Sequence, residues 1–252
     1  MTIDYLCTMH LIPSIFNSQK VIAAQSTRNG GISPNPFNSL NLGMAVNDTP
    51  ENVLKNRALF FNSLGIDLSQ ISTSKQIHGN AILHATAAGI SEGFDAQITN
   101  QKGLFLVVSV ADCTPILIHD EKTNAVAAIH AGWRGTVENI VKNTLQEMNA
   151  EFGTEGKNCK AFIGACIGYN QFEVGQEVAA QFEEPFVRFD RQKQKYFVDL
   201  KAANKQQLIG FGIPSTNIEI TDFCTVTNND IFFSHRKEKG STGRMMAVIG
   251  LK

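Results

Sequence analysis

Three apolar segments follow one another between residues 103 and 130, and they constrain the fold more than any other feature. They are Gly103–Val110, Pro115–His119 and Ala125–His130. Short runs that are apolar throughout, instead of alternating with polar residues, are typical of strands buried on both faces. We therefore expect these strands to lie in the covered interior of a sheet.

Helical patterns surround these strands. Thr49 is a candidate N-cap followed by a proline at the first helical position, and the apolar spacing continues to Gly65. We expect further helices over 135–148, 174–182 and 199–209, and further strands over 21–26, 71–77, 160–164, 218–221 and 245–249. Because the two types are mixed without strict alternation, we predict an α/β (α+β) fold with a mixed sheet and flanking helices, in a single domain over residues 1–252.

Composition narrows the class of function. The chain of 252 residues is 43% apolar and 18% charged, with a formal net charge of -1. This balance argues against docking on nucleic acid or on an anionic membrane. The start lacks the pattern of a signal peptide, and the five cysteines are odd in number and scattered. We expect a cytoplasmic protein, a monomer or small homo-oligomer, that acts on small molecules.

Two histidines and a cysteine stand out as candidate metal ligands. His78, Cys113 and His130 each lie at or near the end of a predicted strand, and Gly79 and Gly132 follow the two histidines. Two imidazoles and one thiolate leave the fourth position of a tetrahedral zinc ion free, which is the arrangement of catalytic sites. Asp112 could hydrogen-bond to one of these ligands and orient it without binding the metal itself.

The same residues allow two other interpretations. Cys113 could be a thiolate nucleophile with His130 or His78 as its base. The cluster could also stabilise a binding module that has no catalytic role. We expect His10, His84 and His119 to be structural or surface residues, and Cys7, Cys159 and Cys224 to be small buried hydrophobes.

Several polar segments are candidates for binding an anion. The Gly30-Gly31 pair could form a nest of N–H groups or a plain surface turn. Arg236 and Arg244 could clamp a phosphate or carboxylate. Glu173 is expected either to cap the helix over 174–182 or to bind substrate.

Taken together, these motifs resemble the YfiH family, also called the laccase-domain, polyphenol-oxidase or peptidoglycan editing factor family. The resemblance rests on blocks in one order over nearly the whole chain: residues 27–33, 36–43, 56–57, 76–79, 111–115, 130–135, 167–168, 172–175 and 242–245. The family often has proline where this chain has Ala165 and tyrosine where it has His235.

The resemblance implies a fold similar to that of the bacterial deamidating toxins, and zinc bound by His78, Cys113 and His130. It also implies a purine nucleoside phosphorylase that cleaves adenosine, inosine, guanosine and methylthioadenosine with phosphate, with adenosine deamination as a further activity. Arg236 would lie on the substrate side, together with Arg28, Asn41 and Gln76. Cys113, His130 and Asp112 would be catalytic, with Asp112 moving protons in deamination.

Two alternatives to this chemistry remain. One is an amide hydrolase with Cys113 as nucleophile, acting on peptidoglycan precursors. The other is a copper-dependent polyphenol oxidase. A multicopper enzyme needs more histidine ligands than the six in this chain, although two histidines, a cysteine and a methionine would suit a blue-copper centre. Electron-transfer copper would not need the polar loop or the arginines, so we expect zinc rather than copper.

Overall fold

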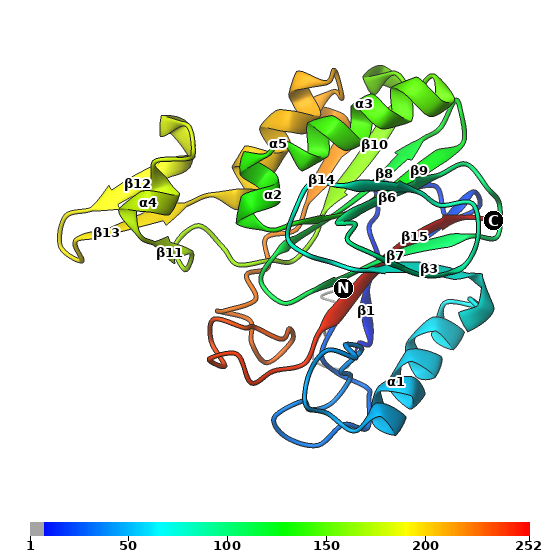
Figure 1. Cartoon of the computed structure of the whole chain (residues 1–252), viewed down its shortest axis with the longest axis horizontal. Coiled ribbons are helices and arrows are strands. Elements are labelled where there is room, and N and C mark those ends of the chain that lie inside the picture. The colour runs from blue at the N-terminus through cyan, green and yellow to red at the C-terminus, as the bar shows by residue number, and fades with distance from the viewer. Residues whose placement is uncertain (1–7) are drawn as a thin grey trace.

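The structure is a computed structural model, and it describes residues 8–252. Within this range two six-stranded sheets lie against each other, and a three-stranded sheet projects to one side (Figure 1). The first sheet has the spatial order β1 (His10–Leu11), β2 (Val21–Ser26), β15 (Met245–Leu251), β7 (Phe105–Val110), β3 (Ile71–Lys75) and β5 (Gly89–Glu92). The second has the order β14 (Ile218–Ile220), β10 (Cys159–Ile163), β8 (Thr114–Asp120), β9 (Ala125–Ala131), β6 (Ala96–Thr99) and β4 (Ile82–His84). The third consists of β11 (Glu173–Val174), β13 (Lys195–Val198) and β12 (Val187–Asp190).

Both large sheets are mixed. In the first, β15 runs antiparallel to β2 and β7, whereas β3 runs parallel to β7 and β5. In the second, β10 is antiparallel to β8 and parallel to β14. Mixed sheets with helices on their outer faces confirm the predicted α/β class.

The three apolar segments form β7, β8 and β9, at the centre of the two sheets. Between the sheets, Leu106 and Val108 of β7 share one apolar cluster with Leu117 and Ala128 of the facing strands. All residues of β8 and β9 are buried, so the prediction that these strands are covered on both faces is confirmed. Burying a leucine or valine side chain stabilises the fold by about 1.5–3 kcal/mol.

Helices cover the two outer faces (Figure 1). α3 (Ile140–Phe152) and α5 (Leu200–Gly210) lie on the second sheet, where Leu145 and Leu208 share one apolar cluster with Ile129. α1 (Pro50–Ser63) lies against the first sheet through Phe60 and Phe61. Two short helices, α2 (Trp133–Val137) and α4 (Gln176–Ala179), complete the α-helices of residues 8–252. The same range contains four single 3-10 turns: Leu68–Gln70 (η1), Gly156–Asn158 (η2), Glu184–Phe186 (η3) and Ser215–Asn217 (η4).

Two helices differ from their predictions. The helix expected over 135–148 is divided into α2 and α3, because Asn139 adopts a left-handed conformation with φ of 60°. The helix expected over 174–182 is wrong for most of its length. Glu173 belongs to strand β11, its carboxylate pairs with Lys195 at 3.2 Å, and Gly175 is the N-cap of the four-residue α4. The proposed cap at Glu173 is therefore also wrong.

The long polar loop after β2 is held by one buried side chain of α1. Asn56 is fully buried, and its amide donates to Ser33 Oγ at 2.8 Å and to the carbonyls of Ser39 and Asn41 at 3.1 and 3.0 Å. The loop can therefore keep a fixed course without secondary structure of its own. No helix within residues 8–252 has the length and apolar character needed to cross a membrane.

Candidate functional site

The three candidate metal ligands meet where the two sheets approach each other. His78 follows β3, Cys113 lies between β7 and β8, and His130 lies in β9. Pro115 of β8 pairs with His130, which brings the start of β8 beside it. The ligand atoms of the three residues lie within 4.8 Å of one another, and no other group of three or more such residues occurs in the described range 8–252. We call His78, Cys113 and His130 the ligand cluster.

A buried carboxylate organises the ligand cluster. Asp95, at 1% exposure, accepts a hydrogen bond from His130 Nδ1 at 2.8 Å. It also accepts the backbone N–H groups of Ile77, His78 and Gly79 at 3.1, 3.0 and 2.8 Å. Burial disfavours its charge, but these bonds outweigh burial and lower the Asp95 pKa. One side chain therefore fixes the ring of one ligand and the backbone of another.

Sequence reasoning missed Asp95 and assigned its role to Asp112. The only local signal is an acid placed directly before the buried strand β6. An unpaired carboxylate is costly inside a protein, so an acid in that position indicates a partner. The sequence does not show that this partner is His130.

The backbone at His78 is held in an uncommon conformation. Its φ is 62°, in the left-handed region that residues other than glycine rarely adopt. The three hydrogen bonds to Asp95 stabilise this turn, and the turn directs the imidazole towards Cys113. The His78 and His130 rings meet edge to face, with centroids 4.8 Å apart.

The charges of the ligand cluster stabilise one another. Burial opposes ionisation of the Cys113 thiol, but the charge and hydrogen bonds of His130 and His78 outweigh it and lower the Cys113 pKa to about 6. Burial likewise disfavours the His130 imidazolium, but Cys113 and Asp95 raise the His130 pKa to about 9. In contrast, burial raises the pKa of Cys159 to about 12 and that of Cys166 to about 11. The lowered pKa of Cys113 favours its thiolate, which is the form that binds a metal or attacks a substrate.

Four features of the ligand cluster fit a metal ion. Its nitrogen and sulfur donors are those that zinc prefers, and the three ligand atoms lie within 4.8 Å of one another, close enough to converge on one ion. Asp95 supplies the carboxylate that orients a ligating histidine and leaves His130 Nε2 facing Cys113. Gly132 leaves the space free, because a Cβ there would lie 3.3 Å from Cys113 Sγ and 3.2 Å from His78 Cδ2.

Asp112 links the ligand cluster to the predicted substrate arginine. Its carboxylate accepts Thr225 Oγ1 at 2.5 Å and the backbone N–H of Arg236 at 2.6 Å. Arg236 is exposed, and its Nη1 donates to the carbonyl of Gln171 at 3.3 Å. The backbone of Arg236 is therefore tied to the residue that precedes Cys113, while its guanidinium lies over the Phe172 ring, 5.6 Å from the centroid, with donors left for a ligand.

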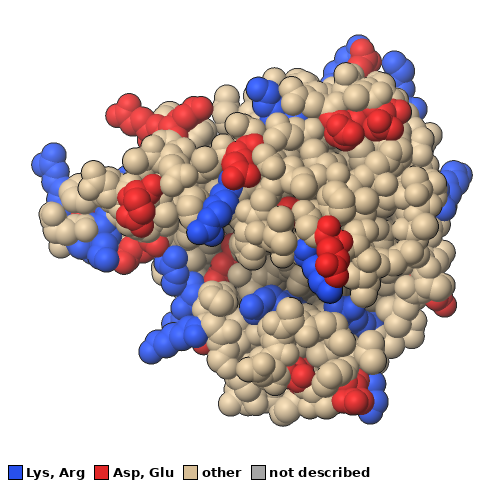
Figure 2. Space-filling view, viewed as in Figure 1, with Lys and Arg blue, Asp and Glu red and all other residues tan. Residues whose placement is uncertain are grey.

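Arg244 and Asn41 occupy the same neighbourhood. Burial lowers the Arg244 pKa, while the charges of Asp112 and Cys113 raise it in part, which places this guanidinium within their electrostatic reach. Asn41 is fully buried, and its Oδ1 accepts the backbone N–H of Arg244 at 2.9 Å. Asn41 thus holds Arg244 and does not itself face the solvent. Figure 2 shows Lys and Arg side chains around a hollow near the middle of this face of the molecule.

The remaining two predicted binding residues make internal contacts. Gln76 Nε2 donates to the Ser109 carbonyl at 2.9 Å, and Gln76 Oε1 accepts the Ser109 N–H at 2.7 Å. Arg28 is 7% exposed and donates to the carbonyls of Asn38 and Asn229 and to Glu238 Oε1 at 3.1 Å. Of the four residues, Arg236 is exposed, Gln76 is half-buried, and Arg28 and Asn41 are buried. The Gly30-Gly31 segment is tied to Ser39, whose Oγ accepts Gly31 N–H at 3.1 Å.

The other histidines and cysteines lie outside the ligand cluster. His84 pairs with Glu151 at 3.1 Å and His119 is fully buried. Cys159 is buried as predicted, whereas Cys224 is half-buried and Cys7 lies outside the described residues.

Comparison with known proteins identifies the family. The family described as multi-copper polyphenol oxidoreductase laccase matches residues 22–252. A protein of Bacteroides thetaiotaomicron named purine nucleoside phosphorylase is 37% identical over 240 residues, which cover 89% of each chain. The Escherichia coli protein named purine nucleoside phosphorylase YfiH is 34% identical, with 96% of this chain and 98% of the relative covered.

Solved structures agree with this match. The crystal structure of YlmD from Geobacillus stearothermophilus has a TM-score of 0.91 and 30% identity and covers 97% of both chains. The crystal structure of the Bacillus licheniformis hypothetical protein YfiH has a TM-score of 0.88 at 32% identity, over 92% of this chain and 93% of that one. The chain therefore belongs to the laccase-domain family that includes YfiH and YlmD.

Proposed function

We propose that this chain is a zinc-dependent purine nucleoside phosphorylase. The observation that carries the proposal is the ligand cluster, fixed by Asp95 and linked through Asp112 to the backbone of the exposed Arg236. Relatives that match nearly the whole chain are named purine nucleoside phosphorylase. Adenosine, inosine, guanosine and methylthioadenosine are the proposed substrates, with phosphate as the second substrate. We place the reaction in the cytoplasm, where the Cys113 thiol stays reduced.

His78, Cys113 and His130 would hold the zinc ion, each with one donor atom. Zinc in such a site supplies a Lewis acid that polarises a substrate oxygen or an ordered water. Asp95 keeps His130 in the tautomer whose Nε2 is free to bind, because its carboxylate accepts the hydrogen on Nδ1. Zinc is preferred to copper because only one group of ligands occurs within residues 8–252, whereas multicopper chemistry needs several centres.

The reaction forms a bond between a phosphate oxygen and the anomeric carbon as the bond to the purine nitrogen breaks. Arg236 would bind the phosphate and hold it in line for attack, since a guanidinium offers paired donors to an oxyanion. Positioning of this kind removes several kcal/mol from the barrier. The Asp112 carboxylate would position Arg236, because it accepts the backbone N–H of Arg236.

The three other predicted residues would act through their neighbours. Arg28 pairs with Glu238 and so supports the segment that carries Arg236. Asn41 holds the backbone of Arg244, and Gln76 holds the turn that leads to His78. We assign them positioning roles.

A second activity would use the same site. Deamination of adenosine requires water to add to the purine C6 and a carboxylate to move protons, and Asp112 is the candidate for that carboxylate. Its two oxygens already accept hydrogen bonds, which favours phosphorolysis as the main reaction.

One observation favours a different class of enzyme. The Cys113 pKa of about 6 and the His130 pKa of about 9 describe a thiolate–imidazolium pair in the metal-free protein. Such a pair could attack an amide, for example in a peptidoglycan precursor. The second imidazole directed at the same sulfur favours metal binding, because a nucleophile needs only one base.

The deciding experiment incubates the protein with each nucleoside, with and without phosphate. We expect free purine and ribose 1-phosphate only when phosphate is present, and neither product with Cys113→Ala. Purine release that is independent of phosphate would show a hydrolase. Full activity after metal removal, lost on alkylation of Cys113, would support the cysteine nucleophile.

A further inference from the structure

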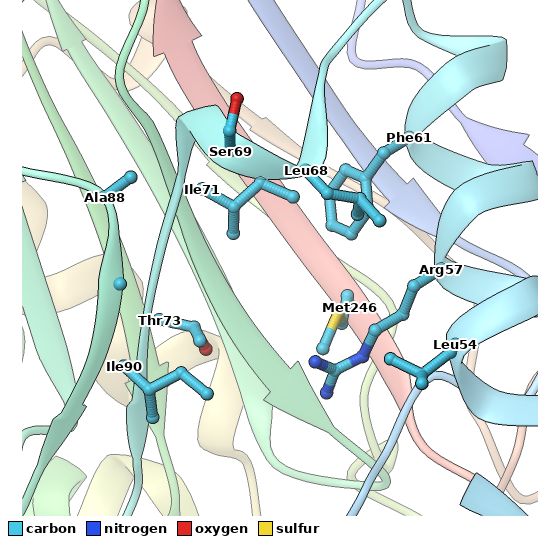
Figure 3. Close-up of a pocket in the computed structure, with 11 residues that line it drawn as sticks. Leu54, Arg57, Phe61, Leu68, Ser69, Ile71, Thr73, Ala88, Ile90 and Met246 are labelled. Atoms are coloured by element: carbon cyan, nitrogen blue, oxygen red, sulfur yellow. The ribbon is translucent and has the colours of Figure 1, made fainter. Parts of the chain in front are cut away.

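A cavity of about 410 Å³ lies between α1 and the edge of the first sheet (Figure 3). Its walls are mainly apolar and come from α1, η1, β3 and β5, through Phe61, Leu68, Ile71 and Ile90. No residue of the ligand cluster lines it. A cavity of this size is large enough for a small ligand.

Arg57 is the charged residue of this cavity. In Figure 3 its side chain extends from α1 and ends close to Met246. Its Nε donates to the carbonyl of Leu42 at 2.8 Å, which fixes the side chain. Within residues 8–252 no acidic side chain pairs with Arg57, and none lines the cavity. Burial lowers the Arg57 pKa.

The mouth of the cavity is apolar. Leu54 and Ile90, on opposite walls, are 53% and 68% exposed, and Leu68 is 43% exposed. Large exposed apolar side chains gathered in one place indicate a binding surface. A guanidinium that is partly desolvated and lacks a counterion favours an anion.

We propose that this cavity binds a small amphiphilic carboxylate, with its headgroup on Arg57 and its apolar chain against Phe61, Leu68 and Ile90. The two terminal nitrogens of Arg57 can donate to both oxygens of a carboxylate, because only Nε is engaged within the chain. The Thr73 hydroxyl lines the same cavity and offers a further donor. The site is separate from the proposed nucleoside chemistry, since none of His78, Cys113, His130 and Arg236 lines the cavity.

Octanoate, below its micelle concentration, is the probe, and calorimetry measures its binding to the full chain. We expect saturable binding of one octanoate per chain. Arg57→Met keeps an unbranched apolar stem and removes the guanidinium with its charge, so it should weaken binding at least tenfold. Arg191→Met is the matched control, because Arg191 lies in the exposed turn between β12 and β13, and it should leave binding unchanged.

Ile90→Asp tests the site without touching Arg57. Ile90 is exposed, so this variant should fold normally, and its carboxylate should abolish octanoate binding by repulsion. Asparagine has the shape of aspartate without its charge, so Ile90→Asn should weaken octanoate binding much less than Ile90→Asp. Inosine turnover should be the same in the wild type and in Ile90→Asp.

Three binding results would overturn the proposal. They are no saturable octanoate binding to the wild type, equal binding by Arg57→Met and the wild type, and competition between inorganic phosphate and octanoate. The last would assign the cavity to the nucleoside site. A concentration-dependent dimer that Ile90→Asp dissolves would also overturn it, since a second copy would then cover the apolar mouth.

Discussion

The ligand cluster and the segment that carries the arginines are built in opposite ways. The ligand cluster sits on or beside strands β3, β8 and β9 of the two large sheets and shares one buried carboxylate, Asp95. The arginine loop, residues 222–244, carries Arg236 and Arg244 and contains neither helix nor strand, apart from one bridge between Cys224 and Cys166. The cluster is therefore held by the sheets, and the loop by the buried side chains of Ile231, Phe232 and Phe233 together with individual polar side chains.

Glu238 is the main support of the arginine loop. Its carboxylate accepts hydrogen bonds from Arg28 Nη2 and from three groups of the loop itself. These are Asn229 Nδ2 at 3.2 Å, the Ser234 N–H at 3.2 Å and Thr242 Oγ1 at 2.5 Å. Asp112 adds the connection to the ligand cluster. This difference implies that metal binding and phosphate binding can be changed separately by mutation.

The largest effect is expected in the ligand cluster. His130→Ala should abolish stable zinc binding and lower kcat/KM by at least about 100-fold, because several kcal/mol of stabilisation by the metal would be lost. Metal analysis and phosphate-dependent purine release measure the two effects. Cys159→Ala, which removes a buried sulfur elsewhere, is the control and should keep both. A His130→Ala protein with full zinc content would refute the assigned ligands.

Asp95→Asn should have the next largest effect. Loss of the carboxylate weakens the orientation of His130, and such changes typically reduce metal affinity about 10- to 100-fold. A competition titration with a chelating dye measures the zinc affinity. Asp112→Asn is the matched comparison on the loop side and should alter zinc affinity much less. Equal losses in both variants would mean that the two regions are not separate.

Arg236→Met should raise the KM for phosphate about 10- to 100-fold, the size expected when hydrogen bonds to a charged group are lost. Its zinc content should not change, because the side chain does not touch the ligand cluster. Lys237→Met, the exposed neighbour, serves as the control. If the KM for phosphate stays constant, Arg236 does not bind it.

Glu238→Gln should destabilise the arginine loop and not the sheets. We expect a loss of about 1–3 kcal/mol in the free energy of unfolding, because buried donors lose a charged acceptor. The KM for phosphate should rise while zinc affinity stays at the wild-type value. Denaturant unfolding and steady-state kinetics measure these changes. Zinc loss in this variant would contradict the separation of the two regions.

The smallest effect is expected at His119, in β8 near the end away from Cys113. This imidazole is fully buried, neither of its nitrogens has a hydrogen-bond partner among the described residues, and burial lowers its pKa below 6.5. The unfolded chain therefore binds the proton more readily, so stability is present above about pH 6.5 and falls as pH decreases below that value, by at most about 1.4 kcal/mol per pH unit.

His119→Leu should remove this dependence. Unfolding free energies at pH 7.5 and 5.5 should differ less in the variant than in the wild type. An identical pH dependence in both proteins would show that His119 does not titrate as a buried neutral group.

The sequence predicted the parts of the fold that local patterns determine. The uniformly apolar runs predicted β7, β8 and β9, and Thr49-Pro50 predicted the start of α1. It failed where tertiary contacts override local preference, as at Glu173, which pairs in a sheet with Phe197. Short strands such as β5 and β6 were missed because their patterns are too brief to distinguish from loops.

The site divides in the same way. His78, Cys113 and His130 were found because each lies in a recognisable block of residues. Asp95 was not, since its role depends on contacts with segments 16 to 35 residues away in the chain. Arg28 and Asn41 were expected to face substrate, but their side chains are directed into the protein, which no local pattern indicates.

We infer that the ligand cluster forms one metal site on which phosphorolysis depends. The most direct test strips the protein of metal and adds zinc back in steps, while inosine and phosphate are converted to hypoxanthine and ribose 1-phosphate. We predict no turnover without zinc, a linear rise to a plateau at one zinc per chain, and no rise for Cys113→Ala. Full turnover by the metal-free protein, or turnover that ignores phosphate, would contradict it.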